Sequence, residues 1–193
     1  MSRIGVLALQ GAFLEHQVLL ERLGAEVIQV RLPAQLDGLD GLIIPGGEST
    51  TIGKLAVAYG LLEPLREFGR SKALWGTCAG AIFLAKDIGL DQPILGLMDI
   101  TIRRNAFGRQ VDSFETNLRV DFGEPNGSQA QPFRAVFIRA PLIEAVHGAT
   151  RPLAQLEDGR IVAAREGRLL ATVFHPELTA DDRFHRYFLE MTK

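Results

Sequence analysis

The chain has 193 residues, of which 47% are hydrophobic and 23% are charged, a composition typical of a globular protein with one substantial core. We therefore expect one domain over residues 1–193. A net charge of −2 gives no electrostatic reason to expect nucleic acid or an anionic membrane surface as a partner.

The sequence also gives no sign of membrane insertion or export. Glycine, proline or a charge interrupts every apolar run before it reaches the length of a membrane span, and the first run passes into Gln10 and Gly11 without a signal-peptide cleavage site. Cys78 is the single cysteine, so an intrachain disulfide is impossible. We expect a cytoplasmic protein with no membrane partner.

The first half of the sequence predicts alternating strands and helices. Short apolar runs that end at glycine or proline indicate buried parallel strands, and apolar residues at helical spacing indicate helices between them. The expected strands are 4–9, 26–30, 41–44 and 73–76, and the expected helices are 12–23, 50–59, 63–68 and 79–85. This repetition predicts an α/β fold: a three-layer, open, mainly parallel twisted sheet with helices on both faces.

The second half predicts short strands separated by turn residues, which we interpret as an antiparallel β extension of the sheet. The expected strands are 99–103, 114–121, 135–139, 153–156, 161–165 and 169–174, and the polar segment 124–131 is expected to be a surface loop. The segment Thr179-Ala180-Asp181-Asp182 resembles a capping box. It predicts a final helix whose core face carries Phe184, Tyr187, Phe188 and Met191.

Cys78 stands between small residues where the predicted strand 73–76 turns into a helix. Helix-terminal N–H groups and the positive end of the helix dipole favour a thiolate there. Much later in the chain, His175 and Glu177 flank Pro176. A lone cysteine with a distant histidine and a carboxylate beside it is typical of a cysteine nucleophile with an oriented base. These residues alone leave open a buried structural cysteine and a plain His-Pro-Glu turn.

Gly46 and Gly47 follow the predicted strand 41–44, so they lie at the same edge of the sheet as Cys78. A Gly-Gly pair can turn its amides toward a ligand as oxyanion donors or as an anion cradle, although a plain tight turn is the alternative. The spacing of a phosphate-binding loop is absent.

The histidines predict no metal site, because they and Cys78 have no compact ligand spacing. His16 and His185 fall in predicted helices and His147 in a predicted loop. We interpret these three as surface or packing residues and not as catalysts.

Six segments of the sequence resemble the class I glutamine amidotransferases, and among them the glutaminase subunits of pyridoxal 5′-phosphate synthase. They are GVLALQG at 5–11, PGGESTT at 45–51, GTCAG at 76–80, RNAFGRQ at 104–110, FIRAP at 137–141 and FHPEL at 174–178. The Cys-His-Glu set is common to the whole class. The Gln-Gly, Gly-Glu-Ser-Thr, Asn-Ala-Phe-Gly-Arg-Gln and Ile-Arg-Ala-Pro elements distinguish the family, and the six segments cover nearly the whole chain in order.

The resemblance implies a glutaminase that needs no cofactor, hydrolyses L-glutamine and passes ammonia to a synthase subunit that makes pyridoxal 5′-phosphate. It implies Cys78 as the nucleophile, His175 as the group that transfers protons and Glu177 as the group that orients His175. The implied oxyanion donors are the backbone amides of Gly47 and Ala79. The residues implied to hold glutamine are Gly47, Glu48, Ser49, Arg104, Ile138 and Arg139, and those implied to couple the site to the partner are Gln10 and Gly46.

Two alternatives remain at this stage. The chain could be the glutaminase subunit of another amidotransferase pathway, such as histidine biosynthesis, but the Gly-Glu-Ser-Thr and Asn-Ala-Phe-Gly-Arg-Gln segments argue against it. It could also be a non-catalytic subunit that senses glutamine, but Cys78, His175 and Glu177 are all present. Glutamate release on mixing with the synthase would separate these readings.

Overall fold

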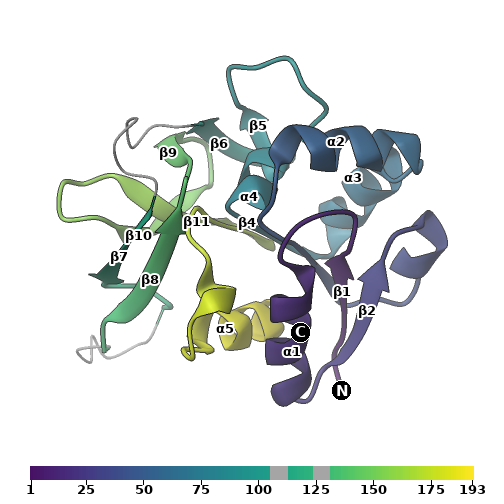
Figure 1. Ribbon diagram of the computed structural model, residues 1–193, viewed down its shortest axis with the longest axis horizontal. Helices are drawn as coiled ribbons and strands as arrows, with labels where there is room; N and C mark the ends of the chain where they lie inside the picture. The colour runs from purple at the N-terminus through teal and green to yellow at the C-terminus, as the bar shows by residue number, and fades with distance from the viewer. Residues whose placement is uncertain (105–112, 124–130) are drawn as a thin grey trace.

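The computed structural model describes residues 1–104, 113–123 and 131–193. Within them, ten strands form one sheet in the order β2-β1-β3-β4-β12-β11-β9-β6-β5, with β10 paired to β11, and β7 and β8 form a separate pair (Figure 1). The strands are β1 (Arg3–Leu7), β2 (Glu26–Val30), β3 (Gly41–Ile44), β4 (Ala73–Thr77), β5 (Ala85–Asp87), β6 (Met98–Arg103), β7 (Ser113–Leu118), β8 (Phe133–Ile138), β9 (Leu142–Val146), β10 (Arg151–Gln155), β11 (Ile161–Glu166) and β12 (Leu169–Thr172).

Helices cover both faces of the parallel part of the sheet, which confirms the predicted three-layer α/β architecture. α1 (Phe13–Arg22) and α5 (Arg183–Met191) lie on one face, and α2 (Ser49–Ala58), α3 (Leu62–Ser71) and α4 (Ala79–Leu84) lie on the other (Figure 1). Two short 3₁₀ helices, η1 (Pro33–Leu36) and η2 (Pro176–Leu178), complete the helical elements of the described residues. β1 to β4 and β12 pair in parallel, and β3 and β4 are buried along their whole length.

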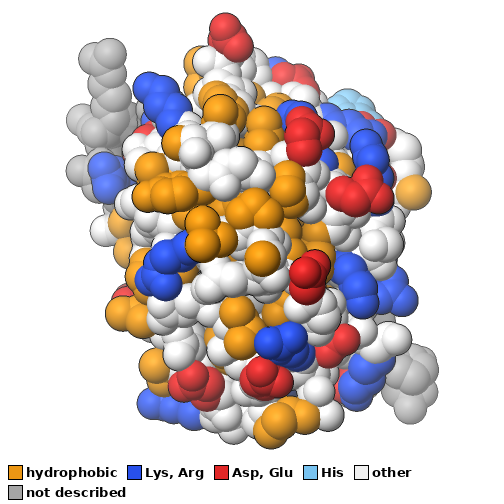
Figure 2. Space-filling view, turned by 90° about the vertical axis from the view of Figure 1, so that its right-hand side faces the viewer, with side chains coloured by type: hydrophobic (Ala, Val, Ile, Leu, Met, Phe, Trp, Pro, Cys, Tyr) orange, Lys and Arg blue, Asp and Glu red, His pale blue; other side chains and the backbone are white. Residues whose placement is uncertain are grey.

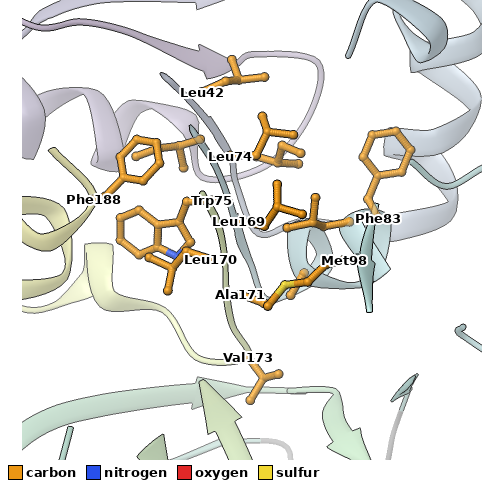
Figure 3. Packing of buried hydrophobic residues seen from close by; sticks show 14 of the residues in the cluster. Leu42, Leu74, Trp75, Phe83, Met98, Leu169, Leu170, Ala171, Val173 and Phe188 are labelled. Atoms are coloured by element: carbon orange, nitrogen blue, oxygen red, sulfur yellow. The ribbon is translucent and has the colours of Figure 1, made fainter. Parts of the chain in front are cut away.

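The core has one layer on each face of the sheet. Figure 3 shows Trp75 and Phe188 on one side of the central strands and Phe83 and Met98 on the other. The Trp75 ring centroid is 5.6 Å from that of Phe188, and its indole N–H donates to Thr172 Oγ1 on β12 at 3.1 Å. On the predicted core face of the last helix, Phe184, Phe188 and Met191 are buried and Tyr187 is partly buried.

The second half of the chain forms the predicted antiparallel extension. β12 pairs in parallel with β4 and antiparallel with β11, so it joins the two halves of the sheet. β9 and β5 were not predicted as strands. Only Ile143 is fully buried in β9, and two of the three residues of β5 are exposed, so neither segment has a clear strand pattern.

The predicted capping box at the last helix is wrong in detail. Thr179 Oγ1 donates to the Pro176 carbonyl and accepts from Asp181 N, which makes a turn before the helix. α5 begins only at Arg183, and its N-cap residue Asp182 makes no side-chain cap. Asp181 instead accepts from the backbone N–H of Arg183 at 3.2 Å and pairs with its guanidinium. The Asp181 carboxylate, and not the Thr179 hydroxyl, therefore accepts a hydrogen bond from the first backbone N–H of α5.

The surface carries charges of both signs. Seen from the side of β2 and α3, hydrophobic side chains gather over the middle of the face, and Lys, Arg, Asp and Glu side chains are interspersed around them (Figure 2). None of the helices in the described residues has the length and apolar character needed to cross a bilayer. Residues 105–110 of the sequence motif at 104–110, and residues 124–130 of the predicted loop, lie outside the described residues.

Candidate active site

Cys78 occupies a strained turn between β4 and α4. Its φ is +49° and its ψ is −106°, a conformation that L-residues rarely adopt and that costs on the order of 1–3 kcal/mol. The turn is held from both sides, because Cys78 N donates to Thr172 O at 2.8 Å while Cys78 O accepts from Ala81 N at 3.1 Å. Such a strand-to-helix turn directs the nucleophile out of the sheet.

Two glycines make this turn possible. A Cβ on Gly76 would lie 2.4 Å from the carbonyl oxygen of Gly80, and a Cβ on Gly80 would lie 2.0 Å from the carbonyl oxygen of Ile44. Both contacts are with backbone, which cannot move aside. The small residues beside Cys78 are therefore required by close packing as well as by the sharp turn.

His175 and Glu177 are held next to Cys78 by β8 and η2. His175 N donates to Val136 O at 2.8 Å, and His175 Nδ1 is 2.7 Å from Glu177 Oε1. The backbone of Gly46 fits against both His175 and Cys78: a Cβ there would lie 2.5 Å from His175 Cε1 and 3.3 Å from Cys78 Cβ. The sequence-predicted Cys-His-Glu set therefore comes together in space.

The electrostatics of the site favour a charged imidazole. Burial opposes a proton on His175, but hydrogen bonds with Cys78 and Glu177 and the attraction of both groups raise the pKa of His175 to about 10. Burial likewise opposes ionisation of Glu177, yet the contact with His16 and the hydrogen bond and charge of His175 lower the pKa of Glu177 below its ordinary value. At neutral pH the site holds an imidazolium against a carboxylate.

A second pair of histidines lies behind Glu177. His16 on α1 and His185 on α5 are fully buried, and His16 Nδ1 is 2.9 Å from His185 Nε2. His16 Nε2 lies 3.5 Å from Glu177 Oε2. Burial lowers the pKa of both histidines, that of His185 to about 2. Both are buried in the core, which fits the interpretation as packing residues, but sequence reasoning missed the contact with Glu177. The available signal was a histidine on the apolar face of each helix.

The Gly46-Gly47 loop is tied to the turn after β1. Ala12 N donates to Gly46 O at 3.0 Å, and Glu48 N donates to Gln10 Oε1 at 2.8 Å. The carbonyl and the N–H of a trans peptide point in opposite directions. The bond from Ala12 to the Gly46 carbonyl therefore also sets the direction of the Gly47 N–H.

These elements surround a cleft of about 420 Å³. Of the site residues predicted from the sequence, Glu177 lies behind His175 and does not line the cleft. The other eleven line it: Gln10, Gly46, Gly47, Glu48, Ser49, Cys78, Ala79, Arg104, Ile138, Arg139 and His175. Arg139 has a φ of +43°, so a second strained residue stands at the rim of the cleft. Within the part of the chain that the structure describes, no group of three His, Cys, Asp or Glu side chains is placed to hold a metal ion.

Charges of opposite sign meet at one end of the cleft. Glu48 caps α2 by accepting from Thr50 N and Thr51 N, and the hydrogen bonds, chiefly that from the Thr51 hydroxyl, lower the pKa of Glu48 to about 2. Arg104 Nη2 is 3.6 Å from Glu48 Oε1. Among the described residues, Ser49 Oγ is one of the few buried side-chain polar atoms without a hydrogen-bond partner. This end of the cleft suits a ligand that carries both charges.

Comparison with known proteins shows which family the chain belongs to. Residues 6–193 match the SNO glutamine amidotransferase family over nearly the whole chain. The chain belongs to this family. Among relatives of the SNO glutamine amidotransferase family, pyridoxal 5′-phosphate synthase subunit PdxT of Herpetosiphon aurantiacus is 62% identical over 192 residues, covering 96% of this chain and 98% of the relative. The subunit of that name from Roseiflexus castenholzii is 58% identical, covering 97% and 99%.

A solved structure gives the same result in three dimensions. A crystal structure of a glutamine amidotransferase matches with a TM-score of 0.90 and 51% identity, and the match covers 98% of both chains. The family resemblance drawn from the six sequence segments and the predicted fold class are confirmed by these matches.

Proposed function

We propose that this chain is the glutaminase subunit of a pyridoxal 5′-phosphate synthase. It hydrolyses L-glutamine to glutamate and ammonia, and it delivers the ammonia to a synthase subunit. The contact of Cys78 and His175, which line the cleft, with Glu177 behind His175 carries the proposal, in a chain whose relatives are named as this subunit. We assign residues 1–193 to one glutaminase domain, since one sheet joins both halves of the chain. We place this domain in the cytoplasm, where a lone thiol stays reduced.

The reaction begins at Cys78. The proton of the Cys78 thiol passes to His175, the sulfur attacks the carbon of the glutamine side-chain carboxamide as a thiolate, and His175 then gives this proton to the departing nitrogen. Because Nδ1 of His175 is hydrogen-bonded to Glu177, Nε2 is the ring nitrogen available for this transfer. The raised pKa of His175 supports this role, because the imidazole already holds a proton at neutral pH.

Ammonia then leaves and a thioester joins the glutamyl group to Cys78. Gly47 and Ala79 line the cleft together with Cys78, and their backbone amides would stabilise the oxyanion of the tetrahedral intermediate. One such donor typically contributes about 3 kcal/mol to the transition state. A water molecule, deprotonated by His175, attacks the thioester and releases glutamate.

The other end of the cleft would recognise the amino-acid part of L-glutamine. The guanidinium of Arg104 suits the α-carboxylate, and the carboxylate of Glu48 suits the α-ammonium group. The unpartnered hydroxyl of Ser49 offers a further hydrogen bond. Ile138 and Arg139 line the cleft and complete the proposed binding set.

Coupling to the synthase would act through the Gly46-Gly47 peptide. Ammonia free in water at neutral pH is mostly protonated, so hydrolysis is useful only when a docked synthase receives the ammonia. The bond from Ala12 to the Gly46 carbonyl, and the contact of Gln10 with Glu48 N, link the direction of the Gly47 amide to the turn after β1. A partner that binds one orientation of this peptide better would switch the oxyanion site.

The test is isotope transfer in the assembled complex. The chain is mixed with the synthase subunit and its sugar phosphates, and amide-¹⁵N glutamine is supplied as the nitrogen source. We expect equal amounts of glutamate and ¹⁵N-labelled pyridoxal 5′-phosphate, and neither with a His175→Asn chain. Glutamate release without label in the product would assign the chain to another amidotransferase pathway. Absence of glutamate release would identify a non-catalytic subunit.

A further inference from the structure

Two buried histidines form a contact chain that ends on the carboxylate of the active site. His16 Nδ1 is 2.9 Å from His185 Nε2, and His16 Nε2 is 3.5 Å from Glu177 Oε2 and 3.3 Å from Thr77 Oγ1. The rings of His16 and His185 both pack edge-on against Trp75, at 5.5 and 4.9 Å between centroids. α1, α5 and η2 are thus connected by polar contacts inside the core.

The positions of the protons follow from the charge of Glu177. Burial keeps both histidines neutral, so each ring carries one N–H. A proton on His16 Nε2 faces the carboxylate and the Thr77 hydroxyl, and His16 Nδ1 then accepts from His185 Nε2–H. The opposite arrangement would direct a lone pair of His16 at the carboxylate. It would also bury an N–H at His185 Nδ1, which has no hydrogen-bond partner among the described residues.

We propose that His16 and His185 are positioning residues for the glutaminase reaction, an inference that rests on the function proposed above. In this arrangement the His16 Nε2–H lies against Thr77 Oγ1 at 3.3 Å and faces Glu177 Oε2 at 3.5 Å, where it stabilises the carboxylate and leaves Oε1 for His175 Nδ1. His185 fixes the tautomer of His16 by donating to its other ring nitrogen. Neither histidine lines the cleft, so both act through Glu177.

The arrangement answers a specific need of the site. Glu177 has no exposed side-chain surface, and its Oε2 has no hydrogen-bond partner among the described residues. A buried carboxylate needs donors on both oxygens to keep its charge and its orientation. His16 Nε2, which lies 3.5 Å from that oxygen, is placed to supply an N–H toward it. Outer partners of this kind typically change activity by about tenfold to a hundredfold.

The first experiment is a double-mutant cycle in the assembled complex, with kcat and KM for glutamine as readouts. His16→Leu removes the donor, His16→Gln keeps an amide near the position of Nε2, and exposed His147→Gln is the control. We expect His16→Leu to lower kcat at least about tenfold with KM unchanged, and His16→Gln to restore most of it. In a Glu177→Gln chain, His16→Leu should change kcat less than about twofold, because the carboxylate it acts through is gone.

An equal loss from His16→Leu in both backgrounds would overturn the proposal, because a merely structural role does not depend on Glu177. A wild-type complex without glutaminase activity would refute the proposed function instead, and the positioning role would fall with it. The two failures are therefore distinguishable.

A second measurement uses the wild-type chain, so it does not depend on whether a variant with a core substitution folds. Imidazole ¹⁵N NMR of the full wild-type chain reports the tautomer and charge of each of its four histidines. We expect His16 and His185 to be neutral Nε2–H tautomers between pH 6 and pH 8, and His175 to be charged. A neutral Nδ1–H tautomer of His16, or a protonated His16, would contradict the proposed hydrogen bonds whatever the variants do.

Discussion

Burial of His185 should make the fold sensitive to mild acid, and His185→Leu should remove much of this sensitivity. The pKa of His185 is lowered by burial, and secondarily by His16, from 6.5 to about 2. The unfolded chain therefore binds a proton below pH 6.5 that the folded chain rejects, so stability falls as pH falls through this window. Linkage gives a loss of about 2 kcal/mol between pH 7 and pH 5 from His185 alone.

Two other histidines also change how the free energy of unfolding depends on pH. The lowered pKa of His16 adds to the loss on the acid side. The raised pKa of His175 acts oppositely: its stabilisation is fully present below pH 6.5 and is lost as pH rises toward about 10. The variant keeps His175 and His16, so the difference between variant and wild type reports His185 together with its contact with His16.

The assay is urea unfolding followed by circular dichroism, at pH 7 and pH 5, for wild type, His185→Leu and His147→Gln. The wild type should lose about 2 kcal/mol more than His185→Leu between the two pH values. The variant at exposed His147 should follow the wild type. If His185→Leu lost as much stability as the wild type, His185 would not be buried in its neutral form and the reasoning would be refuted.

Three further predictions concern the reaction. His175→Asn should reduce glutamate release as much as Cys78→Ala, because members of a catalytic unit are not additive. Glu177→Gln should reduce it less, because an orienting group is partly replaceable. Full activity of His175→Asn would exclude the triad. Arg104→Ala should raise KM for glutamine about tenfold, since a hydrogen bond to a charged group contributes about 1.5 kcal/mol or more. The rate at which iodoacetamide alkylates Cys78 should stay unchanged. An unchanged KM would remove Arg104 from the binding set. Without the synthase, glutamate release should be slow. A shift of the Gly46-Gly47 peptide from 1% to 99% in the active orientation needs about 5.5 kcal/mol of preference by the synthase for that orientation. Equal rates of glutamate release with and without saturating synthase would contradict the switch.

The sequence predicted the features that depend on local pattern. Cys78 was identifiable because a lone thiol between small residues follows a buried apolar run, and the parallel strands 41–44 and 73–76 read as continuous apolar segments. β9 was missed because its pairing with β6 and β11, and not its own alternation, makes it a strand. The capping box failed because an ion pair between Asp181 and Arg183 was available.

The histidine pair could not have been placed from the sequence. His16 and His185 are 169 positions apart, and their contact depends on how α1 and α5 pack over Trp75. A histidine on an apolar helix face indicates burial but not its partner. The link to Glu177 also requires η2 to turn that carboxylate back under α1. These are long-range contacts, which local patterns do not encode.

The most direct test of the account is covalent labelling of the nucleophile. The complex is treated with a diazoketone analogue of L-glutamine, with and without excess glutamine, and digested peptides are analysed by mass spectrometry. We expect a single adduct on the peptide that contains Cys78, the only thiol in the chain, together with loss of glutamate release and protection by glutamine. An adduct at another residue, or continued glutamate release after complete labelling of Cys78, would contradict the central claim.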